Sequence, residues 1–396
     1  MNKCVLIVTP RSPFLGRGAD ELDRLSGIRW FIEQEYEVRV VTKTMQSDLP
    51  VVEQSKNELG ISIKSVPYKF NSHTSLWKKI MWYTKRVFWP PYWDGAAYEY
   101  FDTEIQTIVA QEIALHKPDL VWFDYTYLWP LYSLIPHDIP IYTRSINFEP
   151  THFLDEDGRY PWNYIRVVPK LVSEWIVSRR SKFVFAITPK EQKEYALLGT
   201  RSVTLPLRGL PVAGSMPARA INTSNEIHIG FTASTYSVDH NRKALQFILK
   251  EILPKLRQQG TRYVFHFTGS RLPDSIMSLL SADDMHEGFV PSMMDFWARI
   301  DIALVPSLFG AGMQQKVFEP LVLGVPTITS KRAMAGYDFG EKEVVFASSA
   351  SDFVREIQKL SINSEKRKQL SEGSIHLSKK LFSKESVHDV LSSAYL

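Results

Sequence analysis

The sequence predicts an α/β protein of two domains, each built on a parallel β-sheet. The chain has 396 residues, more than one hydrophobic core usually organises. Residues 301–330 run as a short apolar strand, a glycine loop, a helix and a second apolar strand, which is typical of a parallel crossover. Residues 206–225 contain three prolines and two glycines, a composition that indicates a linker between the domains.

Composition excludes several classes of protein. The apolar content of 44% and the charged content of 23% are typical of a globular chain. A single cysteine, Cys4, excludes an internal disulfide framework and a cysteine-rich zinc site, and suits a reducing cytosol. No apolar run reaches about 18 residues, so no transmembrane helix is expected, and the short N-terminal run is interpreted as a first strand. The net charge of +4 is compatible with an anionic ligand or membrane surface.

The first domain should begin with a strand at 5–9, a loop at 10–18, a helix at about 20–34 and a strand at 37–42. Further strands are predicted to start at about 119, 140 and 183, with a helix-rich stretch at 164–181. In the first loop Gly16 and Gly18 allow close backbone approach. Arg11 or Arg17 could bind a phosphate there, or both could be ordinary solvated arginines.

Residues 71–101 combine tryptophans with lysines and arginines. Tryptophans at 77, 82, 89 and 93 alternate with Lys78, Lys79, Lys85 and Arg86. Such a segment could lie in a membrane interface through residues 76–93, or could form a helix whose aromatic side chains pack in the core. Nucleic acid is not an expected partner, since no recognisable binding module accompanies the patch.

The second domain should open with a strand at 227–231, followed by a loop and Arg242, and continue with a strand at 263–268. The crossover at 301–330 then carries the main chemical signal. A loop of Gly310, Ala311, Gly312 and Met313 leads into a helix, whose N-terminal N–H groups favour an anion. Lys316 in the first turn opposes the helix dipole unless an anion lies beside it. Glu319 could accept hydrogen bonds from ribose, or Lys316 and Glu319 could form a solvated pair in an ordinary turn.

The segment GAGMQQKVFEPLVLGVPTITS resembles the nucleotide-sugar-binding segment of GT-B glycosyltransferases, and is similar to family 4 (group 1) of that class. The segments IGFTASTYSVDHNRKALQFILKEILPKL, FHFTGSRLPDSI and HEGFVPSMMDFWARIDIALVPS resemble the same family in the same order. The resemblance covers most of 227–345 and, more loosely, 1–200. It implies two Rossmann-like parallel α/β domains facing each other across a cleft. The first domain would span 1–208, with a final helix at about 382–396 packing back on it. The second domain would span 209–381.

The resemblance also implies roles for particular residues. Lys316 and the helix N-terminus would bind the donor diphosphate, and Glu319 the ribose. Backbone groups at 288–290 would contact the base, although Phe289 could equally lie in the core. The implied donor-binding residues are Gly310, Ala311, Gly312, Met313, Lys316, Glu319, Arg242, Gly288, Phe289 and Val290, with Gly16 and Gly18 from the first domain.

The stretch TRSINFEPTHFLDEDG resembles the family's R-x-HN-x-E arrangement. Arg144, Asn147 and Glu149 match it, while Ile146 stands where the family has histidine, and His152 is a nearby substitute. Asn147, Glu149 and His152 would orient sugar or acceptor, with Lys316 as the fourth catalytic residue. Glu149 would be the base if the enzyme inverts. The alternative is a capped turn with a surface carboxylate.

Three departures from the family pattern bear on activity. Ala233 and Ser234 stand where retaining members usually have arginine, and His240 or Asn241 where they have lysine. Ala311 replaces the first glutamate of a paired motif that Glu319 completes. These losses leave the stereochemical outcome open and leave room for a weak or inactive enzyme.

The resulting hypothesis is a hexosyltransferase-like glycosyltransferase that needs no metal. Like most of the family, it would retain the anomeric configuration of the sugar. It would use a nucleotide-diphosphate sugar, no cofactor, and a glycan, lipid-linked or protein acceptor in cell-surface polysaccharide or glycoconjugate synthesis. Its expected location is cytoplasmic, with peripheral contact at the inner face of the membrane. The alternatives are a non-hydrolysing sugar-nucleotide epimerase of the same fold, or an inactive GT-B binding protein.

Overall fold

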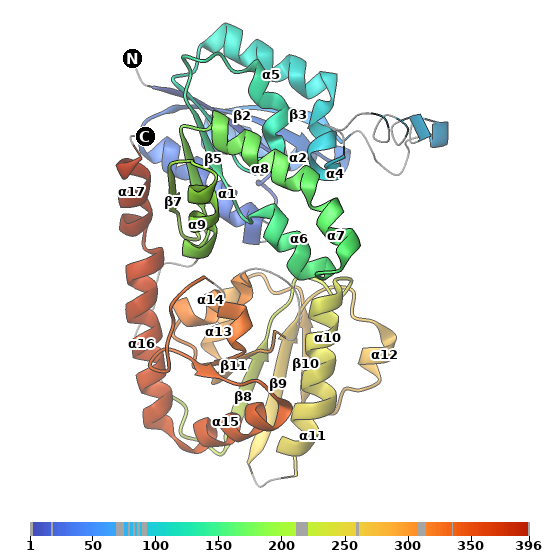
Figure 1. Ribbon diagram of the computed structural model, residues 1–396. Helices are drawn as coiled ribbons and strands as arrows, with labels where there is room; N and C mark the ends of the chain where they lie inside the picture. Colours follow the sequence, from blue (N-terminus) through green and yellow to red (C-terminus); the bar gives the residue numbers. More distant parts are fainter. Residues whose placement is uncertain are drawn as a thin grey trace. The chain divides into compact units, whose positions relative to one another are not determined.

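The chain forms two units in the structure, a computed structural model (Figure 1). The first unit comprises Met1–Gly209 and Val390–Leu396, and the second Leu210–Asp389. The sequence places the boundary at 208/209 and the return of the chain at about 382. The structure describes residues 3–16, 19–68, 75–77, 80–81, 84, 88, 93–210, 221–258, 261–307, 314–334 and 336–394.

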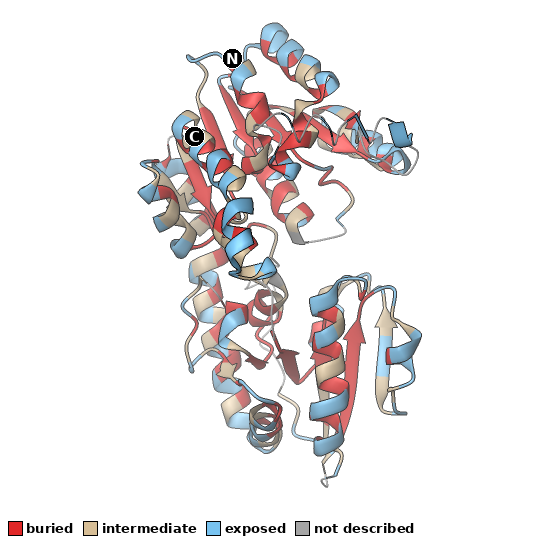
Figure 2. Ribbon diagram, turned by 45° about the vertical axis from the view of Figure 1, so that its right-hand side comes forward, coloured by how far each residue is buried: buried red, intermediate tan, exposed pale blue. Residues whose placement is uncertain are grey.

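The first unit is built on a sheet in which all strand pairs are parallel, in the order β3-β2-β1-β4-β5-β6-β7. Apolar runs form its central strands, because a strand covered on both faces must be apolar throughout, whereas the edge strand β3 also has exposed residues. All six residues of β1 are buried, Cys4 included, and Figure 2 shows the sheet in red. The strands are β1 (Cys4–Thr9), β2 (Glu37–Thr44), β3 (Ser62–Pro67), β4 (Leu120–Phe123), β5 (Ile141–Arg144), β6 (Phe183–Ala186) and β7 (Ser202–Thr204).

The helices of the first unit connect these strands. Their starts follow local capping rules: the Asp102 side chain accepts a hydrogen bond from the Glu104 N–H at the start of α5, and Thr188 caps α9 in the same way. The helices are α1 (Ala19–Glu33), α2 (Leu49–Leu59), α4 (Gly95–Tyr98), α5 (Thr103–His116), α6 (Glu149–Asp157), α7 (Pro161–Arg166), α8 (Val168–Arg180) and α9 (Pro189–Leu197).

The second unit contains a second parallel sheet, in the order β10-β9-β8-β11-β12-β13. Its core includes Ile229, Phe231 and Leu304, which are wholly buried. The strand predicted at 302–305 is β11, with the same bounds. The strands are β8 (Glu226–Phe231), β9 (Arg262–Thr268), β10 (Asp284–Gly288), β11 (Ile302–Val305), β12 (Thr327–Thr329) and β13 (Val345–Phe346).

The helices of the second unit include the crossover helix α14, which begins at Gln315. Gly324 follows it with a φ of +69°, a left-handed conformation that glycine adopts readily. Phe382, at the end of α16, packs on Phe318 and Phe339 of this unit. The helices are α10 (Asp239–Phe247), α11 (Leu253–Leu256), α12 (Asp274–Met277), α13 (Met293–Ala298), α14 (Gln315–Val322), α15 (Ala350–Ile362), α16 (Ser364–Phe382) and α17 (Lys384–Ser393), whose last residues belong to the first unit.

Strand order locates the places where each sheet can bind a ligand. In the first sheet the chain order reverses between β1 and β4, and in the second between β8 and β11. In open parallel sheets the loops that follow the two strands at such a reversal diverge and leave a crevice at the carboxyl edge. The residues that follow β1, β4, β8 and β11 are therefore where functional side chains should be sought.

Candidate functional site

The reversal in the second unit brings together residues that are 75 positions apart. Asn241 lies in the first turn of α10, after β8, and Lys316 in the first turn of α14, after β11. The Lys316 ammonium donates a hydrogen bond of 3.2 Å to the Asn241 Oδ1 atom. It also lies 5.3 Å from the centre of the Phe231 ring, at the end of β8. Two helix N-termini and one cation thus share one edge of the sheet.

Lys316 is a cation with no acidic partner among the described residues. Burial lowers the pKa of its ammonium to about 8. Among the described residues no carboxylate lies within ion-pair distance of it, and its contacts are an amide oxygen and an aromatic face. Removing a charge from water is costly unless an opposite charge replaces the water. The position is therefore suited to an anion.

Glu319 is held by a different partner. The Trp297 indole Nε1–H donates to the Glu319 Oε2 atom at 3.2 Å, and Trp297 itself is wholly buried. Burial raises the pKa of the Glu319 carboxyl group. In the described part of the chain Lys316 and Glu319 form no ion pair, so the solvated pair considered from the sequence is absent. One Glu319 oxygen is anchored, and the carboxylate can accept further hydrogen bonds from a ligand.

Arg242 makes a contact that limits its role. Its guanidinium pairs with Asp239 in the same turn of α10 and donates to the Tyr236 carbonyl oxygen at 3.3 Å. Arg242 is thus engaged within its own helix, while its neighbour Asn241 contacts Lys316. Asn241 also donates to the Thr235 carbonyl oxygen at 3.0 Å, which fixes the amide.

The segment predicted to contact a base follows β10. Gly288 ends the strand with a φ of +60°, and its carbonyl accepts a hydrogen bond from the Gly269 N–H at 2.9 Å. Phe289 is 86% exposed, so the interpretation of Phe289 as a core residue is wrong. Val290 packs against a buried cluster that includes Phe296 and Trp297. The exposed ring of Phe289 is available to a ligand.

Part of the predicted loop cannot be placed. Gly310, Ala311, Gly312 and Met313 lie outside the described residues, as do Arg17 and Gly18 of the first unit. Their roles stay predictions. Gly16 is described, with a φ of +61° that favours glycine.

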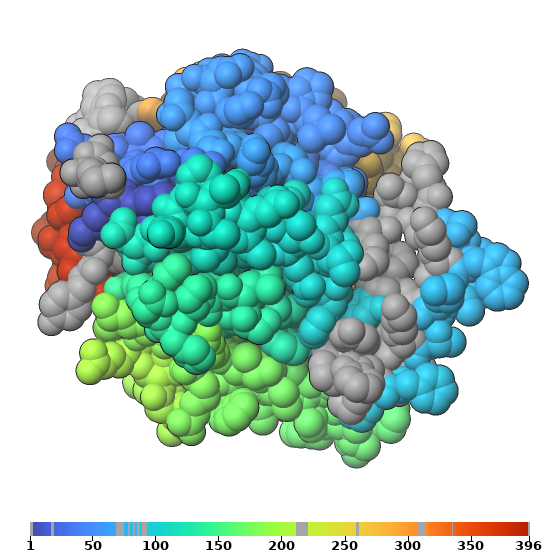
Figure 3. Space-filling model, turned by 90° about the horizontal axis from the view of Figure 1, so that it is seen from above, coloured from blue at the N-terminus to red at the C-terminus, as the bar shows by residue number. Residues whose placement is uncertain are grey.

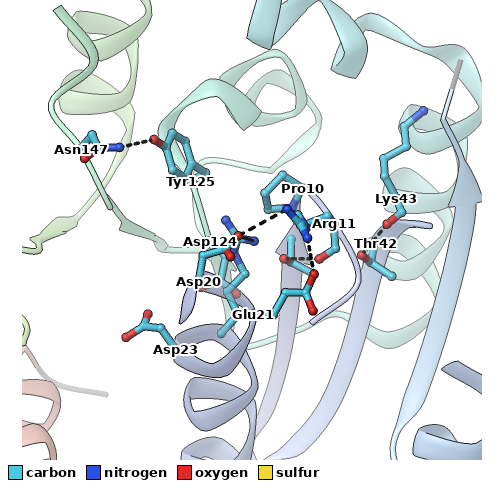
Figure 4. Close-up of polar contacts among 12 residues, drawn as sticks. Pro10, Arg11, Asp20, Glu21, Asp23, Thr42, Lys43, Asp124, Tyr125 and Asn147 are labelled. Carbon is cyan, nitrogen blue, oxygen red and sulfur yellow. Dashed lines mark hydrogen bonds and ion pairs between the residues drawn. The ribbon is translucent and has the colours of Figure 1, made fainter. Parts of the chain in front are cut away.

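The reversal in the first unit lies near polar side chains of α1, of β2 and of the residues that follow β1, β4 and β5 (Figure 4). Arg11, after β1, forms ion pairs with Asp20 and Glu21 of α1, the former at 3.8 Å. Figure 4 shows the Arg11 guanidinium directed at these carboxylates. Arg11 is an exposed arginine whose charge is already matched within the unit, so its contacts do not assign it to a phosphate.

Asn147 and Glu149 belong to a hydrogen-bonded network. The Tyr125 hydroxyl donates to the Glu149 Oε1 atom at 2.7 Å and accepts from the Asn147 amide at 3.2 Å. The Lys170 ammonium lies 3.0 Å from the Glu149 Oε2 atom. The structure thus brings Asn147 and Glu149 together, with both oxygens of Glu149 occupied. Tyr125 was not predicted from the sequence, but it could have been found because it closely follows β4 at the reversal.

His152 lies apart from this network. Its Nε2 atom is 3.5 Å from a Glu156 oxygen, one turn along α6. Its Nδ1 atom is buried without a hydrogen-bond partner among the described residues. Among the described residues the His152 side chain therefore contacts Glu156 and not Asn147 or Glu149.

A buried cluster of charged side chains in the first unit was also not predicted from the sequence. Arg208 lies 2.8 Å from Asp23 and 3.6 Å from Asp124, and Arg144 lies 3.5 Å from Asp23. The two guanidinium groups hold the pKa of Asp23 well below its usual range, against the effect of burial. Arg144 also donates to the carbonyl oxygens of Leu205 and Pro206. The arginine that matches the family motif therefore has a structural role here.

The described residues contain neither a metal-binding cluster nor a membrane-spanning helix. No group of three or more histidine, cysteine, aspartate or glutamate side chains in these ranges is arranged to hold a metal ion. Among the helices that the structure describes, none combines the length and apolar character needed to cross a bilayer.

Comparison with known proteins gives a family match for part of the second unit and a fold match for the whole chain. Residues 226–363, about a third of the chain, match the family model for glycosyl transferases group 1. A search of curated proteins finds no match. The predicted resemblance is thus confirmed over the segment that contains Asn241, Lys316 and Glu319.

Solved structures of GT-B glycosyltransferases match the whole chain at low identity. HepE from Anabaena, in complex with UDP, is 11% identical with a TM-score of 0.65, covering 99% of each chain. Sucrose-phosphate synthase from Thermosynechococcus elongatus is 10% identical with a TM-score of 0.66, covering 100% of this chain and 98% of that one. The lipopolysaccharide outer core galactosyltransferase WaaB is 10% identical with a TM-score of 0.63, covering 99% of each chain. These matches confirm the predicted GT-B fold.

Proposed function

We propose that this protein, a glycosyltransferase of GT-B fold whose residues 226–363 belong to the glycosyl transferases group 1 family, binds its nucleotide-diphosphate sugar at Lys316 and Glu319. The observation that carries the assignment is the Lys316 ammonium, which has no carboxylate partner in the described ranges and lies beside two helix N-termini. A diphosphate would supply the missing negative charge. Helix N–H groups and a cation together are a common phosphate-binding arrangement.

The same contact gives Lys316 a catalytic role. When the bond between sugar and diphosphate breaks, negative charge grows on the departing phosphate oxygen. A cation already positioned at that oxygen stabilises the transition state more than the ground state. The hydrogen bond to Asn241 fixes the ammonium before the donor arrives, so little reorganisation is needed during the reaction.

Glu319 would hold the ribose of the donor. Its anchored carboxylate can accept hydrogen bonds from two vicinal hydroxyl groups, and these would favour the ionised form that burial disfavours. The UDP and UDP-glucose complexes of HepE support uridine as the first base to test. The exposed Phe289 ring offers a stacking surface for that base.

The first unit would provide the acceptor side, and its geometry supports a retaining enzyme. An inverting enzyme needs a base to take the proton of the acceptor hydroxyl. Both oxygens of Glu149 already accept hydrogen bonds, from Tyr125 and Lys170. We therefore assign Glu149 and Asn147 to positioning. Metal independence and the lack of a cofactor belong to the same proposal, since Lys316 and backbone N–H groups would neutralise the diphosphate.

A cytoplasmic protein with peripheral membrane contact, acting in cell-surface polysaccharide or glycoconjugate synthesis, fits the remaining observations. WaaB, which has the same fold, is a lipopolysaccharide galactosyltransferase. Leu76, Trp77 and Phe88 are exposed, which supports the membrane interpretation of residues 76–93 over core packing. Trp82, Trp89 and the four basic residues of that segment lie outside the described residues.

Nucleotide binding tests the assignment without knowledge of the acceptor. Melting temperature would be measured with UDP, GDP, ADP, CMP and dTDP, because a ligand at 100 times its Kd adds about 2.7 kcal/mol of stability. We expect a response to one nucleoside diphosphate that is lost in Lys316→Ala. Lys243→Ala is the matched control, since Lys243 belongs to the same unit and pairs with Asp239.

Consumption of the matching nucleotide sugar separates a transferase from an epimerase. A transferase slowly hydrolyses its donor without acceptor and releases the nucleotide, whereas an epimerase converts the sugar. A protein that binds no nucleotide in the panel would contradict the assignment, and one that binds but never turns over would favour the inactive GT-B protein.

A further inference from the structure

Helix α8 exposes a stripe of apolar side chains and buries a mostly polar face, in which Val177 is the apolar member. Val168, Leu171, Val172 and Trp175 follow the i, i+3, i+4, i+7 spacing of one helical stripe, and all four are exposed. The side turned inward carries Ser173, Glu174 and Ser178, all buried. An ordinary surface helix has the opposite orientation. The orientation of α8 therefore requires an explanation.

Hydrogen bonds hold α8 in this orientation. Glu174 accepts from the Thr126 hydroxyl at 2.9 Å and from the Tyr195 hydroxyl at 2.8 Å. The Ser173 hydroxyl donates to Asp94 at 2.7 Å and accepts from the Trp129 indole at 2.8 Å. A rotation that buried the apolar stripe would leave these groups unpaired or expose them. The outward apolar stripe is thus fixed by the interior of the unit.

The preceding helix extends the exposed stripe. In α7, Trp162 is 66% exposed and Ile165 is also exposed, whereas Asn163 is buried and donates to the carbonyl oxygens of Asp157 and Gly158. We call Trp162, Ile165, Val168, Leu171, Val172 and Trp175 the α7–α8 surface. A contiguous exposed apolar patch on a soluble domain usually marks a binding surface.

Basic residues accompany this surface. Between 159 and 182 the only acidic residue is Glu174, which is buried. Arg166, Arg179 and Lys182 are exposed, and among the described residues none of the three has an ion-pair partner. Arg179 lies 5.8 Å from the Trp175 ring, so a guanidinium borders the apolar stripe. The surface thus combines bulky apolar side chains with unmatched positive charge.

We propose that the α7–α8 surface docks on an anionic lipid bilayer. Its tryptophans and aliphatic side chains would enter the boundary between headgroups and acyl chains, and its cations would meet lipid phosphates. A second copy of the chain fits less well, because a two-fold interface would place these cations near their own copies. This proposal rests on the proposed function in one respect: the peripheral membrane location is the reason for choosing a bilayer as the occupant of the surface.

Helix α8, which carries this surface, contacts through its inward face the residue that follows the basic aromatic segment, residues 76–93. Asp94, immediately after Trp93, contacts α8 through Ser173 at 2.7 Å and Lys170 at 3.9 Å. Figure 3 shows the described residues of 75–88, in light blue, projecting at one side of the first unit. The C-terminal end of that segment is therefore anchored on the helix that carries the apolar stripe.

Vesicle flotation of the full chain tests the proposal. The probes are phosphatidylcholine vesicles with and without 30% phosphatidylglycerol (a chosen composition of about one anionic lipid in three). Binding to the anionic vesicles is expected, with at least tenfold loss in Trp175→Glu and in Trp162→Glu. Arg166→Gln combined with Arg179→Gln should bind about 25-fold more weakly, at about fivefold for each cation near an anionic surface.

Control variants distinguish the α7–α8 surface from the basic aromatic segment and from a dimer interface. Leu197→Glu, at an 87% exposed position on α9, is the matched control and should float like the parent. Equal flotation of the Trp175→Glu variant and the parent would overturn the proposal, as would binding lost only in Trp77→Ser. Concentration-dependent dimers that Trp175→Glu dissociates, without any vesicle binding, would assign the surface to a second copy instead. None of these readouts depends on sugar transfer.

Discussion

The two candidate sites differ in how their charged groups are matched. In the first unit Arg11, Glu149 and Asp23 each have a partner of opposite charge within the unit. In the second unit Lys316 has an amide and a ring, and Glu319 an indole N–H. Matched charges stabilise a fold, whereas a partly buried charge without its counterpart carries a cost that a ligand can remove. The comparison predicts that mutations in the two units will affect different properties.

The largest expected effect is on stability, from the first unit. Asp23→Ala leaves the buried guanidinium groups of Arg144 and Arg208 without their shared carboxylate, and we expect a loss of about 3–5 kcal/mol. Calorimetry can resolve the two units as separate transitions. Asp155→Ala, whose carboxylate forms an exposed pair with Arg159, should change stability by less than about 1 kcal/mol. Equal effects of the two substitutions would contradict the role of the cluster.

The next effect is on catalysis, from the second unit. Lys316→Met keeps the length of the side chain and removes its charge, and we expect turnover to fall by about 10²–10³, or roughly 2.7–4 kcal/mol. Stability should stay unchanged or rise, because the lost ammonium had no carboxylate partner. Donor turnover and melting temperature are measured on the same preparation. A Lys316→Met protein that loses stability but keeps its activity would contradict the claim that Lys316 serves the ligand and not the fold.

A pH effect on stability should come from Glu174. Burial raises the pKa of Glu174 to about 8, above the unfolded value. The folded state then holds its proton more tightly, so stability should fall by up to about 1.4 kcal/mol per pH unit as pH rises from 4.5 to 8. Glu174→Gln should lack this decline, because an amide does not ionise. Urea titrations across that range, on parent and variant, measure the difference, and parallel pH profiles would exclude it.

A pH effect on binding should come from Lys316. With a pKa of about 8 in the unliganded protein, its ammonium loses its proton as pH rises, and Kd for the nucleoside diphosphate should increase about tenfold per pH unit above 8. Lys316→Arg keeps its charge and should show a flat profile, whatever its absolute affinity. Calorimetric titrations at three pH values would show this, and the same slope in both proteins would assign the titration to another group.

The smallest effect should come from Arg11. Its pairs with Asp20 and Glu21 lie partly in solvent, so Arg11→Gln should cost less than about 1 kcal/mol and leave nucleotide affinity unchanged. Melting temperature with and without nucleotide measures both. A large loss of affinity would instead support the phosphate contact that the sequence suggested.

Local patterns in the sequence predict the sheets well. Runs such as Ile302–Val305 are apolar throughout, and only a strand covered on both faces accommodates such a run. The run therefore predicts both that a strand forms and where it lies in the sequence. Lys316 was selected for the same reason, since the pattern around it lies within a few adjacent residues, while the glycine loop before it stays a prediction. Contacts across the sequence were not predictable: Lys316 meets Asn241 75 residues away, and Arg208 meets Asp23 185 residues away.

Orientation is the other limit of sequence reasoning. The spacing of Val168, Leu171 and Trp175 shows that α8 has an apolar stripe, and such a stripe is normally assigned to the core. The stripe faces outward here because Glu174 and Ser173 find partners in the interior, which no local pattern reveals. Phe289 was ambiguous in the same way, since an aromatic residue in a loop has no periodicity that assigns it to core or surface.

The chain crosses between its two units twice, and this has a consequence for synthesis. Residues Val390–Leu396 belong to the first unit, where the Tyr142 hydroxyl donates to the Ala394 carbonyl oxygen at 3.4 Å. On the ribosome the first unit can collapse early, but this contact cannot form until residue 394 has emerged, after the whole second unit. In the nascent first unit the surface around Tyr142 would therefore stay exposed until the last helix has been synthesised, and chaperones could bind it during that time.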